Sequence, residues 1–100
     1  MPEHVRKFRV TKRAKEDLVG IGRYTERVWG KKQRDKYLGE MDACFNWLAQ
    51  DAKLGRHRPE IHDGYFSFPQ GSHVVFYMIG EDFIDIIGIP HKSMDIGTFF

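Results

Sequence analysis

The chain has 100 residues, of which 41% are hydrophobic and 30% are charged, and its formal net charge at pH 7 is +2. This length predicts one globular domain, and the lone Cys44 excludes both a disulfide within the chain and a usual cysteine zinc site. The polar, basic N-terminus is unlike a signal peptide, and no apolar run approaches the roughly 20 residues that span a bilayer, so we expect a cytoplasmic protein that contacts no membrane and needs no metal or cofactor.

The charges are divided unevenly along the chain. Residues 1–36 contain 12 Lys/Arg and five Asp/Glu, a net charge of +7, whereas residues 37–100 contain four and nine, a net charge of −5. A basic half attracts nucleic acid or an acidic protein, and it is also typical of a solvated helix face. The charge pattern alone leaves these interpretations open.

The first half of the chain predicts a short strand and then two helices. Residues 6–10 alternate charged and apolar side chains, Thr11 is a suitable helix N-cap, and Gly30 ends the helical pattern. Steps of three and four connect Ala14, Leu18, Ile21, Thr25 and Val28 on the first helix. A second helix is predicted over residues 32–52. Its stripe is Tyr37, Met41, Cys44, Leu48 and Ala52, widened by Leu38, Phe45 and Trp47. The short break implies an antiparallel helical hairpin.

Three strands are predicted in the second half, over residues 65–69, 73–79 and 83–89. The loops between them are so short that neighbouring strands must be antiparallel. The order β-α-α-β-β-β predicts a single α+β domain over residues 1–100, with the hairpin packed on one face of a small, mainly antiparallel sheet. The sequence does not indicate which edge of the sheet the first strand joins.

The last two predicted strands are apolar on both faces. In the first of them, Val74, Phe76 and Met78 alternate with Val75, Tyr77 and Ile79. In the second, Ile84 and Ile86 alternate with Phe83, Ile87 and Ile89. Because the hairpin covers one face and so short a chain is expected to supply no second cover, the other face is predicted to be a protein interaction site. Alternatively, the sheet curls and buries both faces itself.

Four segments, in this order and spacing, resemble the RelE/ParE superfamily of toxin–antitoxin toxins, and within it ParE. They are VTKRAKEDLVGIGRYTERVWG (10–30), LGRHRPEI (54–61), SFPQGSHVVFY (67–77) and IDIIGIPHKSMD (84–95). The closing His-x-x-Met-Asp, at His91, Met94 and Asp95, is the most ParE-like element. The sequence departs from the family pattern in the segment that ends at Pro90. Since proline donates no ladder hydrogen bond, the strand is expected to end or bulge there.

The resemblance implies an intracellular toxin that a ParD-like antitoxin neutralises with a flexible acidic segment. ParE proteins are described as inhibitors of DNA gyrase that block replication, so we expect the antitoxin and gyrase as partners and no sequence-specific binding of nucleic acid. An uncovered apolar face beside a basic half suits an amphipathic, acidic segment. The residues expected to contact the antitoxin are Arg13, Arg23, Arg27, Arg34, Phe83, Ile87 and Ile89.

The C-terminal tail is expected to bind the target, because its apolar side chains are costly to expose unless something receives them. The candidate residues are His91, Met94, Asp95, Ile96, Phe99 and Phe100. We expect Met94 to anchor the tail in an apolar pocket and Asp95 to pair with Arg56 or Arg58.

Two other functions stay open. The RelE-like branch of the superfamily cleaves mRNA on the ribosome, which needs a base, an acid and cations for the phosphate. The candidates for such a nuclease are His91, Arg56 and Arg58, with Lys92 and Tyr65 beside them. The C-terminal tyrosine of many RelE-like nucleases has no counterpart, because no tyrosine follows Tyr77. A non-toxic relic of the fold that still binds an antitoxin is the third possibility.

Overall fold

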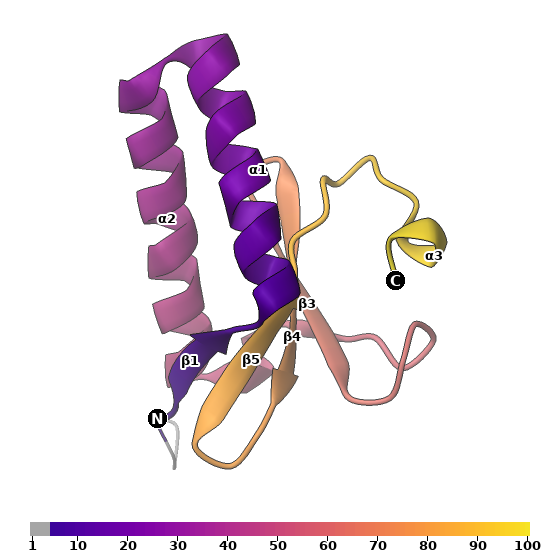
Figure 1. Cartoon of the computed structure of the whole chain (residues 1–100). Coiled ribbons are helices and arrows are strands. Elements are labelled where there is room, and N and C mark those ends of the chain that lie inside the picture. The colour runs from indigo at the N-terminus through magenta and orange to yellow at the C-terminus, as the bar shows by residue number, and fades with distance from the viewer. Residues whose placement is uncertain (1–4) are drawn as a thin grey trace.

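The computed structural model describes residues 5–100, and the domain expected over residues 1–100 therefore begins outside the described residues (Figure 1). The elements in chain order are β1 (Lys7–Val10), α1 (Lys12–Trp29), α2 (Lys31–Gln50), the one-turn helix η1 (Ala52–Leu54), β2 (Arg56–His57), β3 (Tyr65–Gln70), β4 (His73–Ile79), β5 (Phe83–Gly88) and α3 (Ile96–Phe99). The predicted α+β class and the helical hairpin on one sheet are confirmed. The two-residue β2 and the short α3 were not predicted.

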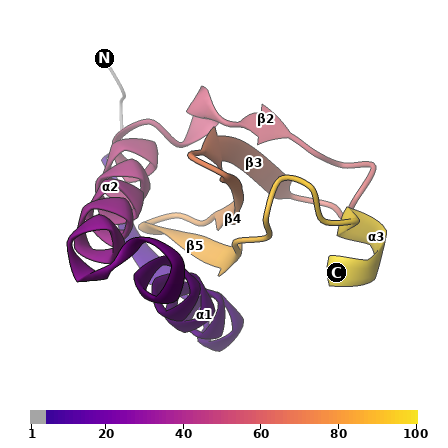
Figure 2. The ribbon, with the colours of Figure 1, turned by 90° about the horizontal axis from the view of Figure 1, so that it is seen from above.

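The sheet has the strand order β1-β5-β4-β3-β2. β1 joins β5 in parallel, with Phe8 opposite Ile84, and the three other pairs are antiparallel. Viewed from above, α1 and α2 lie on one side of the sheet, and α3 lies on the other (Figure 2). We call these the helix face and the tail face.

Two residues of the sequence, an N-cap and a turn glycine, determine where the helical hairpin begins and where it turns. Thr11 caps α1, because its hydroxyl oxygen accepts a hydrogen bond from the Ala14 amide at 3.2 Å. Gly30 has a φ of 94°, which suits glycine, and its amide donates to the Glu26 carbonyl at 2.8 Å. This single residue separates α1 from α2, so the two helices fold back on each other.

The core lies between the hairpin and the helix face of the sheet. Its fully buried side chains include Met41 and Leu48 from α2, Tyr77 from β4, and Ile84 and Ile86 from β5. The far end of the hairpin projects past the sheet (Figure 1). Val28, a member of the predicted helix stripe near that far end, is therefore exposed rather than buried. Trp47 is also exposed, but it lies near the sheet end of α2, with its ring centroid 5.0 Å from that of Phe68. Among residues 5–100, no helix has the length and apolar character needed to cross a membrane.

A bulge between β4 and β5 corrects the predicted alternation of the last strand. Tyr77 pairs with Ile86 and Phe76 pairs with Gly88, so Ile87 is an extra residue in β5. The extra residue reverses the side-chain alternation beyond it, and Ile89 turns into the core, where it is 2% exposed. The prediction that Ile89 shares a face with Phe83 and Ile87 is therefore wrong.

Tyr77 joins the end of the hairpin to the sheet. Its hydroxyl donates to the Ala52 carbonyl at 2.6 Å and accepts from the Gly55 amide at 3.0 Å. Burial raises the pKa of Tyr77 to about 12. One hydroxyl thus satisfies two backbone groups where α2 gives way to η1 and β2.

We predict that Tyr77→Phe lowers the free energy of unfolding by about 1–3 kcal/mol, because it leaves both backbone groups without the hydroxyl. Urea denaturation at pH 7 measures the loss. The matched control is Tyr24→Phe, whose hydroxyl belongs to an exposed side chain, and it should change stability by less than about 0.5 kcal/mol. Equal stabilities for the two variants would contradict this role of Tyr77.

The Tyr77→Phe variant should also change how the free energy of unfolding depends on pH in the alkaline range. The pKa of Tyr77 is about 12 in the folded chain, whereas an unfolded tyrosine has a pKa of about 10. Above about pH 10 the unfolded state has therefore lost a proton that the folded state keeps, and stability falls as pH rises. The Tyr77→Phe variant should show a shallower fall over this range.

Candidate functional site

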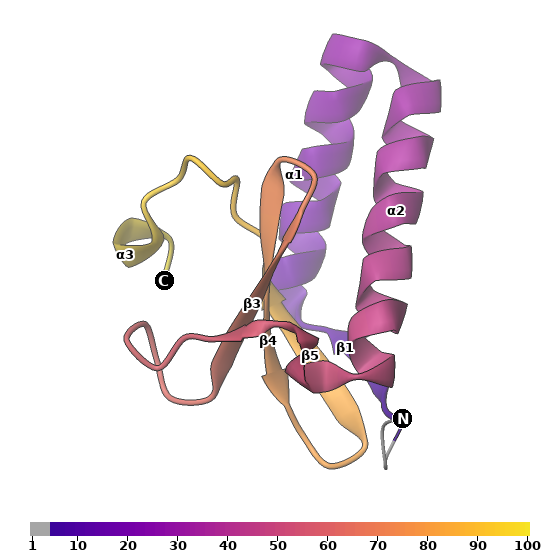
Figure 3. The same cartoon turned by 180° about the vertical axis from the view of Figure 1, so that it is seen from behind.

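Residues 89–100, which we call the tail, first extend the sheet and then fold back over it. His91 forms an antiparallel bridge with His73, and the Lys92 amide donates to the Ser72 carbonyl at 2.9 Å. The tail then turns, with the Met94 amide donating to the His91 carbonyl at 2.9 Å, and returns to the tail face. Seen from behind, it lies on the opposite side of the sheet from α2 (Figure 3).

The end of the tail covers the centre of the tail face. The Phe100 ring packs edge-on against Phe76 at a centroid distance of 5.0 Å and against Tyr65 at 5.2 Å. The guanidinium carbon of Arg58 lies 5.6 Å from the centroid of the Phe76 ring. Phe76 is completely buried as a result. The expectation that this short chain supplies no second cover is thus wrong at Phe76, although Met78 on the same face remains 37% exposed.

Arg13 and Gly88 hold the tail from two sides. The Arg13 guanidinium donates to the Phe99 carbonyl, and its carbon lies 3.9 Å from the centroid of the Phe99 ring. A methyl group at Gly88 would lie 2.7 Å from Cε2 of Phe99 and 3.2 Å from the Phe100 ring. Arg13, predicted to contact an antitoxin, here binds the tail of its own chain.

Asp95 organises the last turn. Its Oδ1 accepts from the Gly97 amide at 3.0 Å, and its Oδ2 accepts from the Thr98 hydroxyl at 3.1 Å. It therefore caps α3, and the expected ion pair with Arg56 or Arg58 does not form. Ile96 is half-buried, and Met94 is 47% exposed along the groove between α1 and the tail.

A polar cluster lies where the tail leaves the sheet. The Tyr37 hydroxyl is 2.6 Å from Nδ1 of His73, and the ring centroids of His73 and His91 are 5.3 Å apart. Burial, with the neighbouring His91, lowers the pKa of His73, and Asp17 partly opposes this. Nδ1 of His91 is 2.8 Å from the Ser93 hydroxyl. His91 thus fixes the turn of the tail, and this cluster was not predicted from the sequence.

The two arginines nominated for a nuclease lie at the other edge of the sheet. Arg56 is exposed in β2 opposite Ser67, whereas Arg58 donates to Glu60 at 2.7 Å and to the Ser67 hydroxyl at 3.0 Å. The hydrogen bond from Arg58 lowers the pKa of Glu60. The strand register places Arg56 and His91 on strands that are three spacings apart and shifted along the sheet. With strand spacings near 4.8 Å and a rise of about 3.4 Å per residue, their Cα atoms are about 15–20 Å apart.

The other predicted antitoxin residues are divided between two surfaces. Phe83 and Ile87 are half-buried on the tail face, where the guanidinium carbon of Arg9 lies 4.3 Å from the centroid of the Phe83 ring. Arg23, Arg27 and Arg34 line a groove of about 460 Å³ between α1 and α2, which we call the arginine groove. Its remaining lining residues are Leu18, Val19, Gly22, Glu26 and Leu38.

Arg34 is already partnered within the arginine groove, because it donates to Glu26 and lies 2.9 Å from a carboxylate oxygen of Asp35. Arg23 and Arg27 are exposed along the ridge of α1. They are therefore the two cations of this groove best placed to meet an acidic segment, over an apolar floor that includes Leu18 and Leu38.

Comparison with known proteins identifies relatives over most of the chain. Residues 8–96 match the model for the ParE toxin of type II toxin–antitoxin systems, parDE. The chain is 36% identical over 88 residues to Toxin ParE1 of Caulobacter vibrioides, which is 88% of this chain and 91% of that protein. It is also 36% identical over 69 residues to Toxin ParE1 of Mycobacterium tuberculosis, which is 68% of this chain and 70% of that protein.

A solved structure has the same fold. A chain of the chromosomal ParDE TA system from P. aeruginosa superposes with a TM-score of 0.74, over 89% of this chain and 98% of that one, at 20% identity. The fold and the sequence matches together define the class of the protein as a small α+β toxin of a type II toxin–antitoxin system. Within that class, this chain belongs to the ParE toxin family.

We predict that Gly88→Ala releases the end of the tail, because the new methyl group overlaps the Phe99 ring. Limited chymotrypsin digestion, followed by mass spectrometry, measures cleavage after Phe99, and the variant should be cleaved several times faster than the wild type. The control is Gly39→Ala on α2, where a methyl group meets no atom within 4 Å. Unchanged cleavage of a folded Gly88→Ala chain would show that Gly88 does not seat the tail.

Proposed function

We propose that this chain is the toxin of a two-protein system, that a ParD-like antitoxin neutralises it, and that the free toxin inhibits DNA gyrase and so blocks replication. The observation that carries the proposal is the match to the ParE toxin family over residues 8–96, supported by 36% identity to Toxin ParE1 of Caulobacter vibrioides. The fold shared with the ParDE system of P. aeruginosa supports an antitoxin as the partner.

The arrangement of the polar residues favours a binder over a nuclease. General acid–base cleavage of RNA needs a proton-transfer group and phosphate-binding cations around one reacting bond. His91 lies at the turn of the tail, whereas Arg56 lies about 15–20 Å away by strand register, and Arg58 is engaged by Glu60. The tail instead offers a surface, because the side chains of Lys92, Met94 and Phe100 are all exposed.

We predict that deletion of residues 96–100 weakens gyrase inhibition. Purified chain is titrated into a supercoiling assay with gyrase and plasmid DNA, and in parallel into translating ribosomes. The wild type should inhibit supercoiling and leave mRNA intact, and the deletion should need roughly tenfold more protein for the same inhibition, about 1.4 kcal/mol of lost binding. Arg56→Ala, an exposed change outside the tail, should inhibit like the wild type.

Because the deletion also uncovers Phe76, its folding is checked by circular dichroism and by antitoxin binding before the assay. Codon-specific mRNA cleavage that is lost in His91→Ala and kept after the deletion would refute the binder and support the RelE-like nuclease. A folded wild type that binds antitoxin but affects neither gyrase nor mRNA would support the non-toxic relic.

We also predict that the exposed arginines of α1 speed the capture of the antitoxin. The double reversal Arg23→Glu with Arg27→Glu should slow association several-fold at low salt and much less at high salt, because rim charges act mainly on the association rate. Stopped-flow mixing with antitoxin at two ionic strengths measures this. The matched control is Lys7→Glu with Lys53→Glu, which makes the same charge change at exposed sites outside the arginine groove. If both double variants slow association equally, Arg23 and Arg27 have no special role and belong to a solvated helix face.

A further inference from the structure

The far end of the helical hairpin concentrates positive charge. We call residues 23–36 the hairpin tip, which comprises the last two turns of α1, Gly30 and the beginning of α2. The hairpin tip contains six Lys/Arg and two Asp/Glu, a net charge of +4, whereas the whole chain has a net charge of +2. It projects past the sheet, so its charges lie away from the rest of the domain (Figure 1).

One arginine holds both carboxylates of the hairpin tip. The Arg34 guanidinium donates to Glu26 and lies 2.9 Å from a carboxylate oxygen of Asp35. Within residues 5–100, the five other cations of the tip have no carboxylate partner, and all five are exposed: Arg23, Arg27, Lys31, Lys32 and Lys36. They form a positive surface that the chain itself does not neutralise.

The two lysines at the start of α2 lie where a helix favours negative charge. The macrodipole makes a helix N-terminus electropositive, so acidic residues stabilise it and cations destabilise it. Lys31 and Lys32 begin α2, and its first turn contains no acidic residue. Packing explains neither lysine, because both side chains are exposed. A local rule that is broken without compensation within the fold is typical of a functional surface.

An aromatic ring lies among these cations. Trp29 is 69% exposed, more than any other large hydrophobic side chain in the described part of the chain. It ends α1 directly before the turn at Gly30, between Arg27 and Lys31 in the sequence. A tryptophan this exposed contributes little apolar burial to the fold, so its ring is available to a ligand.

Cations beside an exposed aromatic ring favour a single-stranded nucleic acid as the ligand. Each nucleotide of a single strand offers a phosphate to a cation and a flat base to an aromatic ring, and neither contact depends on base sequence. In a duplex the bases stack on one another, so a duplex would use the cations and leave Trp29 uncovered. A membrane surface suits a helix with a continuous apolar face, whereas Arg23 and Arg27 directly precede Tyr24 and Val28 along α1.

We propose that the hairpin tip binds single-stranded nucleic acid without sequence preference, with Arg27, Lys31 and Lys32 on neighbouring phosphates and one base stacked on Trp29. This inference goes beyond the proposed function and depends neither on the antitoxin nor on the target of the toxin. Weak binding of this kind would keep the toxin near nucleic acid.

The test measures binding of the purified chain to a labelled oligothymidylate of about 12 nucleotides by fluorescence anisotropy. We expect a dissociation constant of about 1–100 μM that rises with salt, because phosphate contacts release counterions. Lys31→Glu with Lys32→Glu should weaken binding at least about tenfold and flatten the dependence on salt. The same reversal should raise the melting temperature, because it places acidic residues at a helix N-terminus, so the lost binding would not come from misfolding.

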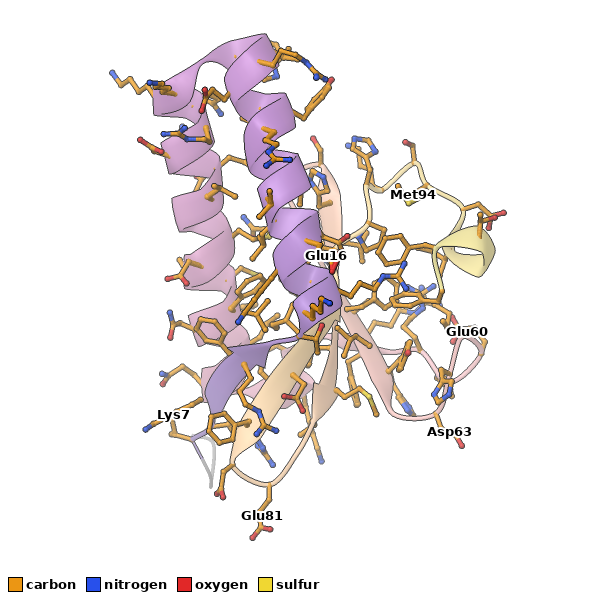
Figure 4. The ribbon with its side chains drawn as sticks, in the orientation of Figure 1. Lys7, Glu16, Glu60, Asp63, Glu81 and Met94 are labelled. Atoms are coloured by element: carbon orange, nitrogen blue, oxygen red, sulfur yellow. The ribbon has the colours of Figure 1, made fainter. Side chains whose placement is uncertain are left out.

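The matched control is Lys7→Glu with Lys53→Glu, which makes the same charge change at two exposed positions outside the hairpin tip. Figure 4 places Lys7 beside β1, away from the hairpin tip. At about 0.15 M salt, where exposed charges more than about 8 Å apart are largely screened, the control should bind within about threefold of the wild type. Poly-L-glutamate, a polyanion without bases, should bind more weakly than oligothymidylate.

A second readout reports the stacked base. Trp29→Ala should weaken binding at least about fivefold and leave the dependence on salt unchanged, because the contact between base and ring involves no ion pair. In a Trp47→Phe background, Trp29 is the remaining tryptophan, and oligothymidylate should quench its emission. An oligouridylate of the same length is titrated in parallel. Binding of either strand supports the proposal, and the preference between them identifies DNA or RNA as the ligand.

Several results would overturn the proposal. They are no binding of either strand at low salt, an equal loss of binding in the two double variants, and an unchanged Trp29 emission at saturation. Equal or tighter binding of a duplex or of poly-L-glutamate would also overturn it, as would binding to phosphatidylglycerol vesicles without binding to either strand. None of these results bears on antitoxin binding or gyrase inhibition, and failure of those two assays would leave this proposal standing.

Discussion

The structure depends on one constraint: β4 carries apolar side chains on both faces, so both faces of the sheet need a cover. Phe76 and Tyr77 are neighbours in the sequence, point to opposite faces, and are both completely buried. The helical hairpin covers Tyr77, and the end of the tail covers Phe76. A domain of 100 residues buries only about two-thirds of its unfolded surface, so its last few residues contribute substantially to the apolar burial.

Helix α1 connects these two covers. Its first turn holds Arg13 against Phe99, and Asp17 accepts a hydrogen bond from the Ile89 amide at 2.9 Å, where the tail begins. The same helix borders both the arginine groove and the groove between α1 and the tail.

Local patterns in the sequence predicted most of the fold. The cap at Thr11, the turn at Gly30 and the apolar spacing of the helices and strands are short-range features, and the structure confirms them. The bulge opposite Phe76 and Tyr77 was expected only as an end or bulge near Pro90, and its position decides that Ile89 faces the core. Periodicity alone cannot place one extra residue, because every side chain beyond it changes face.

The candidate site was less predictable, because it is assembled from residues far apart in the chain. The contact of Arg13 with Phe99 and the seat of Phe99 on Gly88 depend on where the tail turns, which the hydrogen bonds of His91 and Asp95 decide. The sequence indicated that the aromatic side chains of the tail need a receiver, meaning a surface that buries them. It did not indicate that the receiver includes Phe76 of the same chain.

The most direct test of this account is the nuclear Overhauser spectrum of the free chain in solution. We expect cross-peaks between the rings of Phe100 and Phe76, whose centroids are 5.0 Å apart, and between the Phe99 ring and the α-protons of Gly88. Both peaks require the end of the tail to lie on the sheet. Random-coil shifts for residues 96–100, with neither cross-peak present, would contradict the claim that the chain covers both faces of its own sheet.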